Sequence, residues 1–238
     1  YPLRRQRQMC IRDRVAVELG CDAWLFESAR STPQLSFAVR ALNADAGVVL
    51  TASHNPAHDN GFKAYFNDGG QIVEPHATGI IREVNALEGE RYEPVAPELQ
   101  GQLTLLGAEM DRAYMDRLRS LLLRPALLEG AATRVVFTNL HGTGGKIVVP
   151  MMRELGFEVL TVASQDVEDG RFPTVDSPNP ENAPALKLAM ELADEQQAAI
   201  VIGTDPDSDR MGIAARDGQG VMQLPVSYTH LRAHETEA

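Results

Sequence analysis

Short apolar runs alternate with helix-like segments along most of this chain, and that alternation restricts the fold more than any other feature. The apolar runs lie at 23–26, 47–50, 62–66, 134–137, 158–162 and 198–202. Apolar residues recur at helical spacing within 35–42, 80–87, 110–123, 147–155 and 185–192. Strands separated by helices are typical of βαβ units. The sequence therefore predicts an α/β fold with mixed, mainly parallel sheets flanked by helices.

Turn-forming residues suggest where the chain divides. The stretch 88–107 is polar and is broken by prolines and glycines, so it predicts a linker. We expect two consecutive α/β domains, an N-terminally truncated one over 15–107 including the linker and a second over 108–225. The ends, 1–14 and 226–238, continue no hydrophobic pattern and look like translated adapter sequence, so we expect both to be non-native. Native disordered tails are the alternative.

Composition excludes several classes of protein. The chain has 238 residues, 44% hydrophobic content and a formal net charge of −11, which argues against a nucleic-acid-binding protein. No apolar run approaches the roughly 20 residues of a membrane span, and nothing resembles a signal peptide. The two cysteines make no disulfide framework. We expect a cytoplasmic protein whose partner is a small molecule rather than a nucleic acid or a membrane. The sequence does not indicate its oligomeric state.

A serine follows the second apolar run, in the segment Thr51-Ala-Ser-His-Asn-Pro56. A buried strand would fix the position of Ser53, and Pro56 would stiffen the turn that exposes it. Lys63 lies ten residues further on, and a nearby ammonium group could stabilise a serine alkoxide or a phosphoserine, or carry a proton. The plainer interpretation is a capped polar turn followed by a surface lysine.

Three carboxylates follow the last apolar run, in Gly203-Thr-Asp-Pro-Asp-Ser-Asp-Arg210. Asp205, Asp207 and Asp209 are hard oxygen ligands that suit Mg²⁺ or Ca²⁺. An EF-hand loop would need glycine at its sixth position and glutamate at its twelfth, where this chain has Arg210 and Arg216. The sequence therefore favours a cation site after a strand, with an acidic surface loop as the alternative.

A glycine-rich segment, His141-Gly-Thr-Gly-Gly-Lys146, joins a predicted strand to a predicted helix. It is not a Walker A loop, because Ile147 follows Lys146, and it lacks the third glycine of a dinucleotide-binding loop. We expect these glycines to allow close strand–helix packing, with direct substrate contact as the less favoured alternative.

The serine and aspartate segments together supply what phosphoryl transfer needs, namely a group that carries the phosphoryl, a cation site and an arginine. In this order and spacing they resemble the α-D-phosphohexomutase superfamily, in its phosphoglucomutase/phosphomannomutase branch. The resemblance runs over about 15–223. Further matching stretches are Asn60-Gly-Phe-Lys63, Ser31-Thr-Pro33, Asp68-Gly-Gly-Gln71, His141-Gly-Thr-Gly-Gly145, Phe172-Pro-Thr-Val175 and Pro178-Asn-Pro180.

The resemblance implies a role for each site residue. Ser53 would be the phosphoserine that exchanges a phosphoryl group with the substrate. The net reaction would move a phosphoryl group between the C1 and C6 (or C5) hydroxyls of a small-molecule sugar phosphate. A sugar bisphosphate would be the intermediate and activator. One Mg²⁺ would lie between the serine phosphate and Asp205, Asp207 and Asp209. Arg210 would bind phosphate, and Lys63 and His54 would assist with charge and protons.

The chain also departs from the family pattern. Such enzymes have four domains around a cleft, whereas the resemblance here covers an incomplete first domain and a full second one. We therefore expect a fragment that is inactive by itself, and the sequence does not identify the sugar. Two alternatives stay open. One is a Mg²⁺-dependent phosphotransferase or phosphatase with Asp205 as the nucleophile and Asp207 beside it. The other is a non-enzymatic metal-binding module.

Overall fold

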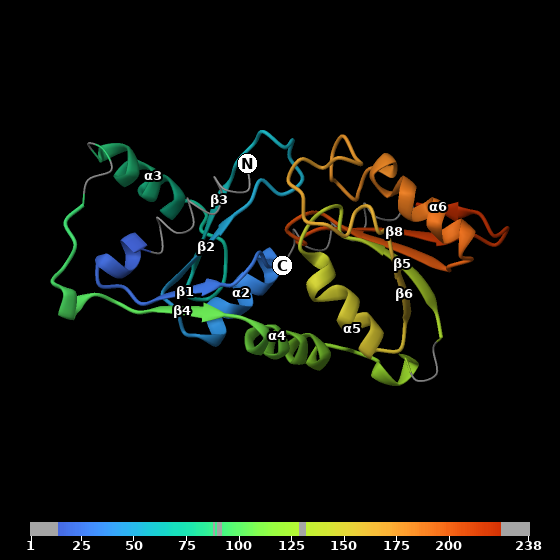
Figure 1. The fold of residues 1–238 in the computed structure, drawn as a ribbon, viewed down its shortest axis with the longest axis horizontal. Coiled ribbons are helices and arrows are strands. Elements are labelled where there is room, and N and C mark those ends of the chain that lie inside the picture. Colours follow the sequence, from blue (N-terminus) through green and yellow to red (C-terminus); the bar gives the residue numbers. More distant parts are fainter. Residues whose placement is uncertain (1–13, 88, 90–91, 129–131, 225–238) are drawn as a thin grey trace. The chain divides into compact units, whose positions relative to one another are not determined.

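The computed structural model describes residues 14–87, 89, 92–128 and 132–224 (Figure 1). The predicted tails therefore lie outside the described residues, except for Arg14, which begins a helical stretch over 14–18. The larger elements are, in chain order, β1 (Ala23–Phe26), α2 (Thr32–Ala41), β2 (Ala46–Leu50), β3 (Phe62–Phe66), α3 (His76–Ala86), β4 (Leu103–Leu106), α4 (Ala108–Ser120), β5 (Arg134–Thr138), α5 (Val148–Glu154), β6 (Glu158–Thr161), α6 (Lys187–Glu195), β7 (Ile200–Thr204), β8 (Met211–Arg216) and β9 (Met222–Gln223). Short 3₁₀ turns lie at Pro97–Leu99, Pro125–Leu128, Gly144–Lys146 and Ala183–Leu186.

The largest sheet has five strands in the order β6-β5-β7-β8-β9. Strand β5 pairs in parallel with β6 and β7, while β8 and β9 run antiparallel to their neighbours. The α/β class and the mixed sheet are confirmed. Antiparallel pairing is more frequent than we predicted, because the chain turns back after β7 and returns along it as β8.

Helices cover both faces of this sheet, as Figure 1 shows. Successive side chains of a strand point to opposite faces. Val136 of β5 lies in the core cluster with Ala189 and Ala193 of α6, whereas its neighbour Phe137 packs with Val149 of α5. Val136 and Phe137 are both fully buried, so burial of β5 on both faces fixes the sheet between α6 and α5.

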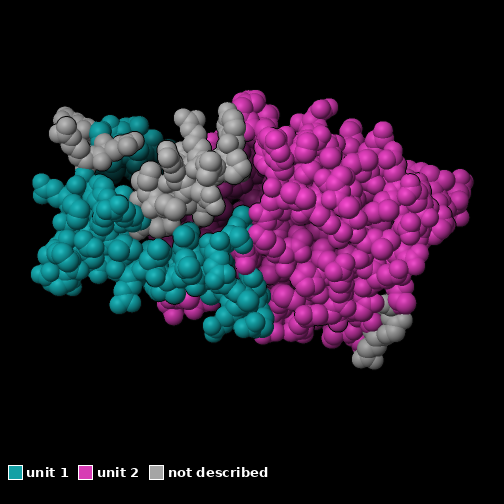
Figure 2. All heavy atoms as spheres, in the orientation of Figure 1, with its two compact units in different colours: residues 1–29, 72–113 teal, residues 30–71, 114–238 magenta. Residues whose placement is uncertain are grey.

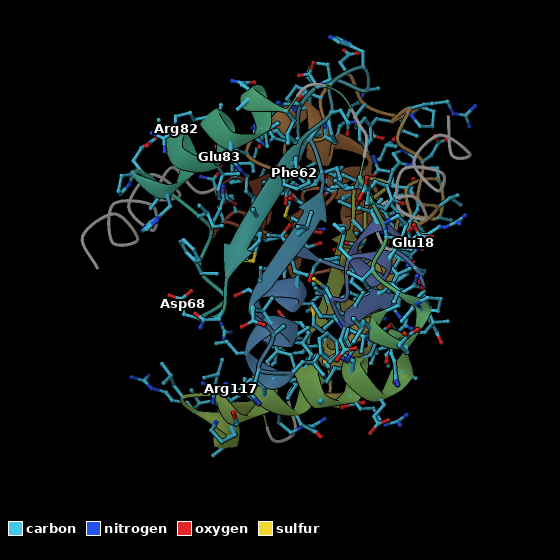
Figure 3. All side chains as sticks on the ribbon, turned by 90° about the vertical axis from the view of Figure 1, so that its left-hand side faces the viewer. Glu18, Phe62, Asp68, Arg82, Glu83 and Arg117 are labelled. Carbon is cyan, nitrogen blue, oxygen red and sulfur yellow. The ribbon has the colours of Figure 1, made fainter. Side chains whose placement is uncertain are left out.

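A second, two-stranded sheet carries the segment that leads to Ser53. Strands β2 and β3 are antiparallel, with Leu50 opposite Phe62. Helix α2 packs so closely on β2 that a Cβ on Gly47 would lie 2.5 Å from a methyl group of Val39. Ser31 caps the helix by accepting a hydrogen bond from the backbone N–H of Gln34 at 3.2 Å. Phe62, labelled in Figure 3, is 59% exposed.

The segments 23–29 and 72–113 form the third part of the fold. Strand β4 pairs in parallel with β1, so part of the predicted linker is a strand. We did not predict this strand because its short run of leucines lies among prolines and glycines, which are typical of a linker. Helix α3 forms where we predicted it but buries none of its residues. Ile81 is 59% exposed, and the neighbouring charged residues Arg82 and Glu83 lie on the outside of the helix (Figure 3).

The chain divides by compactness into two units (Figure 2). One comprises 1–29 and 72–113, and the other comprises 30–71 and 114–238. Both segments singled out in the sequence, around Ser53 and Asp205, belong to the second unit. Among the described residues, no helix has both the length and the apolar character needed to cross a membrane.

Candidate active site

The serine turn begins directly after β2. Ser53 has a left-handed backbone conformation with φ of 52°, which is uncommon for a residue other than glycine. Its backbone N–H donates to Oγ1 of Thr51 at 2.8 Å. The returning chain passes close by, because a Cβ on Gly61 would lie only 2.0 Å from the carbonyl oxygen of Thr51. Local hydrogen bonding and this close approach together hold the serine in its turn.

The aspartate loop begins directly after β7, in the middle of the five-stranded sheet. Asp205 is fully buried, and its Oδ1 accepts hydrogen bonds from the backbone N–H groups of Asp209 at 3.1 Å and Arg210 at 3.0 Å. Ser208 takes a left-handed conformation with φ of 56°. The loop therefore folds around the Asp205 side chain.

The two segments, 152 residues apart in sequence, meet at this point. The Ser53 hydroxyl donates to Oδ2 of Asp205 at 2.7 Å. Lys63 reaches the same loop from β3, and its ammonium group donates to Oδ2 of Asp207 and to Oδ2 of Asp209, at 3.0 Å each. The serine, the lysine and the three carboxylates thus form one group of side chains.

The three aspartates have the composition and spacing of a cation site. One oxygen from each of Asp205, Asp207 and Asp209 lies within 4.8 Å of the others. Oδ1 of Asp207 is buried and has no hydrogen-bond partner among the described residues. A buried oxygen without a partner is costly unless something binds it, and hard divalent cations prefer carboxylate oxygen. These residues therefore fit Mg²⁺.

Burial and neighbouring charges shift the pKa values of Asp205 and Lys63. Burial, together with the negative charge of Asp207, raises the pKa of Asp205. Burial opposes the charged form of Lys63, but the carboxylates of Asp209 and Asp207 outweigh it and raise the pKa of the ammonium group. Lys63 is therefore a fixed positive charge at neutral pH. A bound cation would favour ionised Asp205.

The other two predicted residues flank the serine and aspartate loop. Nδ1 of His54 lies 3.1 Å from the Ser53 hydroxyl oxygen. Burial, with the positive charge of Arg210, lowers the pKa of this imidazole. Arg210 lies 3.4 Å from the carboxylate of Glu181. All the predicted site residues lie in one unit of the chain. Glu181 had no role in the sequence argument, since nothing in its local pattern pointed to Arg210.

The glycine-rich segment after β5 packs against the aspartate loop. A Cβ on Gly142 would lie 2.2 Å from Cα of Pro206, and one on Gly144 would lie 2.4 Å from Oγ1 of Thr204. The backbone N–H of Thr143 donates to the carbonyl of Pro206 at 2.9 Å. Gly142 and Gly144 thus serve close packing. Gly144, in the 3₁₀ turn before α5, lies against Thr204 at the end of β7, which agrees with the strand–helix packing we predicted. Gly142, in contrast, lies against Pro206 of the loop that bears the aspartates.

Fold and site together define an α/β protein in which a serine lies beside a cluster of carboxylates at the ends of strands. Two family models match the chain. The phosphoglucomutase/phosphomannomutase α/β/α domain I matches residues 11–91, and domain II of the same family matches residues 112–218.

Individual relatives agree with the family models. A phosphoglucomutase of Staphylococcus epidermidis (strain ATCC 12228) is 36% identical over 210 residues, which cover 87% of this chain and 38% of that protein. A crystal structure of a Thermus thermophilus protein assigned as a phosphomannomutase has a TM-score of 0.72 and 26% identity, covering 93% of this chain and 48% of that one. A family protein from Burkholderia thailandensis gives a TM-score of 0.66 at 25% identity, covering 92% and 45%.

The chain belongs to the phosphoglucomutase/phosphomannomutase family of the α-D-phosphohexomutase superfamily. It spans 36% of the length of a Staphylococcus saprophyticus phosphoglucomutase to which it is 34% identical.

Proposed function

We propose that this chain supplies the phosphoryl-carrying serine and the cation site of a phosphohexomutase, which moves phosphate between two hydroxyls of one sugar phosphate through a sugar bisphosphate. One observation carries the proposal: the Ser53 hydroxyl lies 2.7 Å from Asp205, within a group of three carboxylates and a lysine. We propose phosphoglucomutase or phosphomannomutase activity for the whole protein, in the cytoplasm.

The transfer begins when the Ser53 oxygen attacks a phosphorus atom of the bisphosphate. The Oγ–P bond forms, the bond from phosphorus to the sugar oxygen breaks, and the sugar oxygen takes up a proton. His54 and Asp205 both lie within hydrogen-bonding distance of the hydroxyl that must lose its proton. Phosphorylated Ser53 then donates its phosphoryl group to the free hydroxyl of an incoming sugar monophosphate and becomes free again. The bisphosphate that forms returns its other phosphoryl group to Ser53, so the phosphate of the released sugar has changed position.

Positive charge near the serine offsets the charge of the transferred group. Lys63 stays protonated beside Asp207 and Asp209, so its role is electrostatic stabilisation of phosphate rather than proton removal. Arg210 would bind phosphate with its guanidinium group. Asp205, Asp207 and Asp209, with the serine phosphate, would hold Mg²⁺. The cation would neutralise the charge that develops on the phosphoryl group during transfer.

The geometry does not favour the aspartate-based alternative. A nucleophilic Asp205 would need one oxygen that faces the substrate. Instead the side chain is fully buried, with Oδ1 bonded to two backbone N–H groups and Oδ2 to Ser53. The division into an N-terminal domain over 15–107 and a second over 108–225 remains our proposal for the domain organisation.

Radiolabelled glucose 1,6-bisphosphate tests the phosphoserine. We expect the whole protein, incubated with it and Mg²⁺, to gain an acid-stable label that peptide mapping places on Ser53. Ser53→Ala should remove the label, whereas Ser164→Ala, an exposed control serine, should keep it. A label on Asp205 that hydroxylamine removes would support the aspartate-based alternative. Cation binding without any label would support the non-enzymatic one.

A further inference from the structure

The turn that begins helix α2 contacts the aspartate loop. Thr32 is the first residue of α2 and is only 6% exposed. The first N–H groups of a helix have no partner within the helix. The N–H of Thr32 finds one outside it, and donates to the carbonyl oxygen of Asp207 at 2.9 Å. The start of α2 is thereby joined to the main chain of the loop.

A second bond joins Thr32 to the side chain of the same aspartate. Its hydroxyl donates to Oδ2 of Asp207 at 2.9 Å, and Asp207 is itself only 4% exposed. Lys63 donates to this same oxygen. Oδ2 therefore has two donors, which fix the rotation of the carboxylate. The other oxygen, Oδ1, is left buried without a partner among the described residues.

We propose that Thr32 is a positioning residue for the cation site: its hydroxyl and its N–H hold Asp207 so that Oδ1 remains available to the cation. The inference rests on the proposed function, because it concerns the same ligands. Partners that orient a metal ligand typically contribute about 10- to 100-fold to metal affinity. Thr32 also lies on the segment that leads through α2 and β2 to Ser53, so it links the nucleophile's segment to the carboxylates.

Helix capping does not account for this hydroxyl. Ser31, not Thr32, is the N-cap, and its side chain accepts the hydrogen bond from the N–H of Gln34. Removing the Thr32 hydroxyl leaves that cap in place, whereas removing the Ser31 hydroxyl leaves the bonds between Thr32 and Asp207 in place. The two neighbouring residues therefore allow helix stability and cation affinity to be separated experimentally.

Titration of the chain with Mn²⁺, followed by electron paramagnetic resonance and repeated with Mg²⁺ by calorimetry, tests the proposal. Thr32→Val keeps the shape and the N–H but loses the hydroxyl, and it should weaken Mn²⁺ binding about 10-fold. Thr32→Ser retains a hydroxyl and should stay within about 3-fold of the wild type. Ser31→Ala should lower the melting temperature without changing cation affinity.

The outcomes separate the inference from the function on which it rests. Equal Mn²⁺ affinity in the wild type and Thr32→Val would overturn the positioning role and leave the phosphoserine proposal intact. Equal losses of affinity and melting temperature in Thr32→Val, Thr32→Ser and Ser31→Ala would overturn it as well, since the effect would then be structural. A wild-type chain that binds neither cation would refute the proposed cation site itself, while serine labelling is measured independently.

Discussion

The two loops that form the site are held in different ways. The aspartate loop has two buried carboxylates, Asp205 and Asp207, and is bonded to two other segments, through the N–H groups of Thr32 and Thr143. The serine turn is exposed from Asn55 to His58, and its backbone hydrogen bonds in the described part of the chain are local. Among the described residues, the Ser53 hydroxyl is the one group of this turn that donates a hydrogen bond to the carboxylates.

This difference suits the two tasks of a phosphoryl-carrying site. Carboxylates that bind a cation work best when their positions are fixed before the cation arrives. A serine that alternates between free and phosphorylated forms must accommodate a group that comes and goes. Segments with few tertiary contacts open at low free-energy cost. We therefore expect changes in the aspartate loop to alter cation affinity, and changes in the serine turn mainly to alter phosphorylation.

The largest effect on cation affinity should follow removal of a ligand from the rigid loop. Asp205→Asn loses one carboxylate charge from the site, and we expect Mn²⁺ affinity to fall by about 100-fold or more, beyond the effect of an orienting partner. Asp176→Asn makes the same change of charge at an exposed aspartate that is not one of the three proposed ligands, and it should leave affinity unchanged. Similar affinities for both variants, measured by paramagnetic resonance, would show that the cation binds elsewhere.

A smaller effect should follow a clash behind the aspartate loop. In Gly142→Ala the added methyl group would lie 2.2 Å from Cα of Pro206, so the loop must shift. We expect a loss of about 1–3 kcal/mol in the free energy of unfolding and about 10-fold in cation affinity. Gly218→Ala, where the methyl group meets nothing within 4 Å, is the control. Calorimetry of both variants measures the two quantities.

The smallest effect on cation affinity should come from the equivalent clash at the serine turn. In Gly61→Ala the methyl group would lie 2.0 Å from the carbonyl oxygen of Thr51. Displacing a reacting group by about 1 Å can cost about 100-fold in rate, so labelling of Ser53 should slow markedly while Mn²⁺ affinity changes less than about 3-fold. If Gly61→Ala weakens Mn²⁺ binding as much as Gly142→Ala, the two loops are not independent and the comparison fails.

Much of the fold could be predicted from the sequence because its strands are short apolar runs that end in distinctive polar segments. The strands before Ser53 and Asp205 follow that pattern, and the structure contains both. Strand β4 escaped prediction, because its four residues lie among turn-forming neighbours and pair with a strand about 80 residues away. The exposure of Ile81 on α3 could not be predicted either, since periodicity indicates an apolar face but not what covers it.

The site was predictable as a set of residue types but not as an arrangement. Hydroxyl, carboxylate and ammonium groups could be named from two motifs, because each motif is local. The contacts of Asp207 with Thr32 and of Arg210 with Glu181 join residues far apart in sequence, so no local pattern indicates them. The glycines after β5 indicated close packing, but only the three-dimensional structure identifies Pro206 as the neighbour.

Residues 30–71 form a compact unit with residues 114–238, and this has a consequence for any attempt to divide the polypeptide. Neither family model covers residues 92–111, so the two domain matches would suggest cutting the chain there. Such a cut would place Ser53, Lys63 and Thr32 on one molecule and all three aspartates on another. A continuous chain holds these groups at a high effective concentration. After a cut, the site would form only when the two molecules associate. The apparent cation affinity would therefore fall as the protein is diluted.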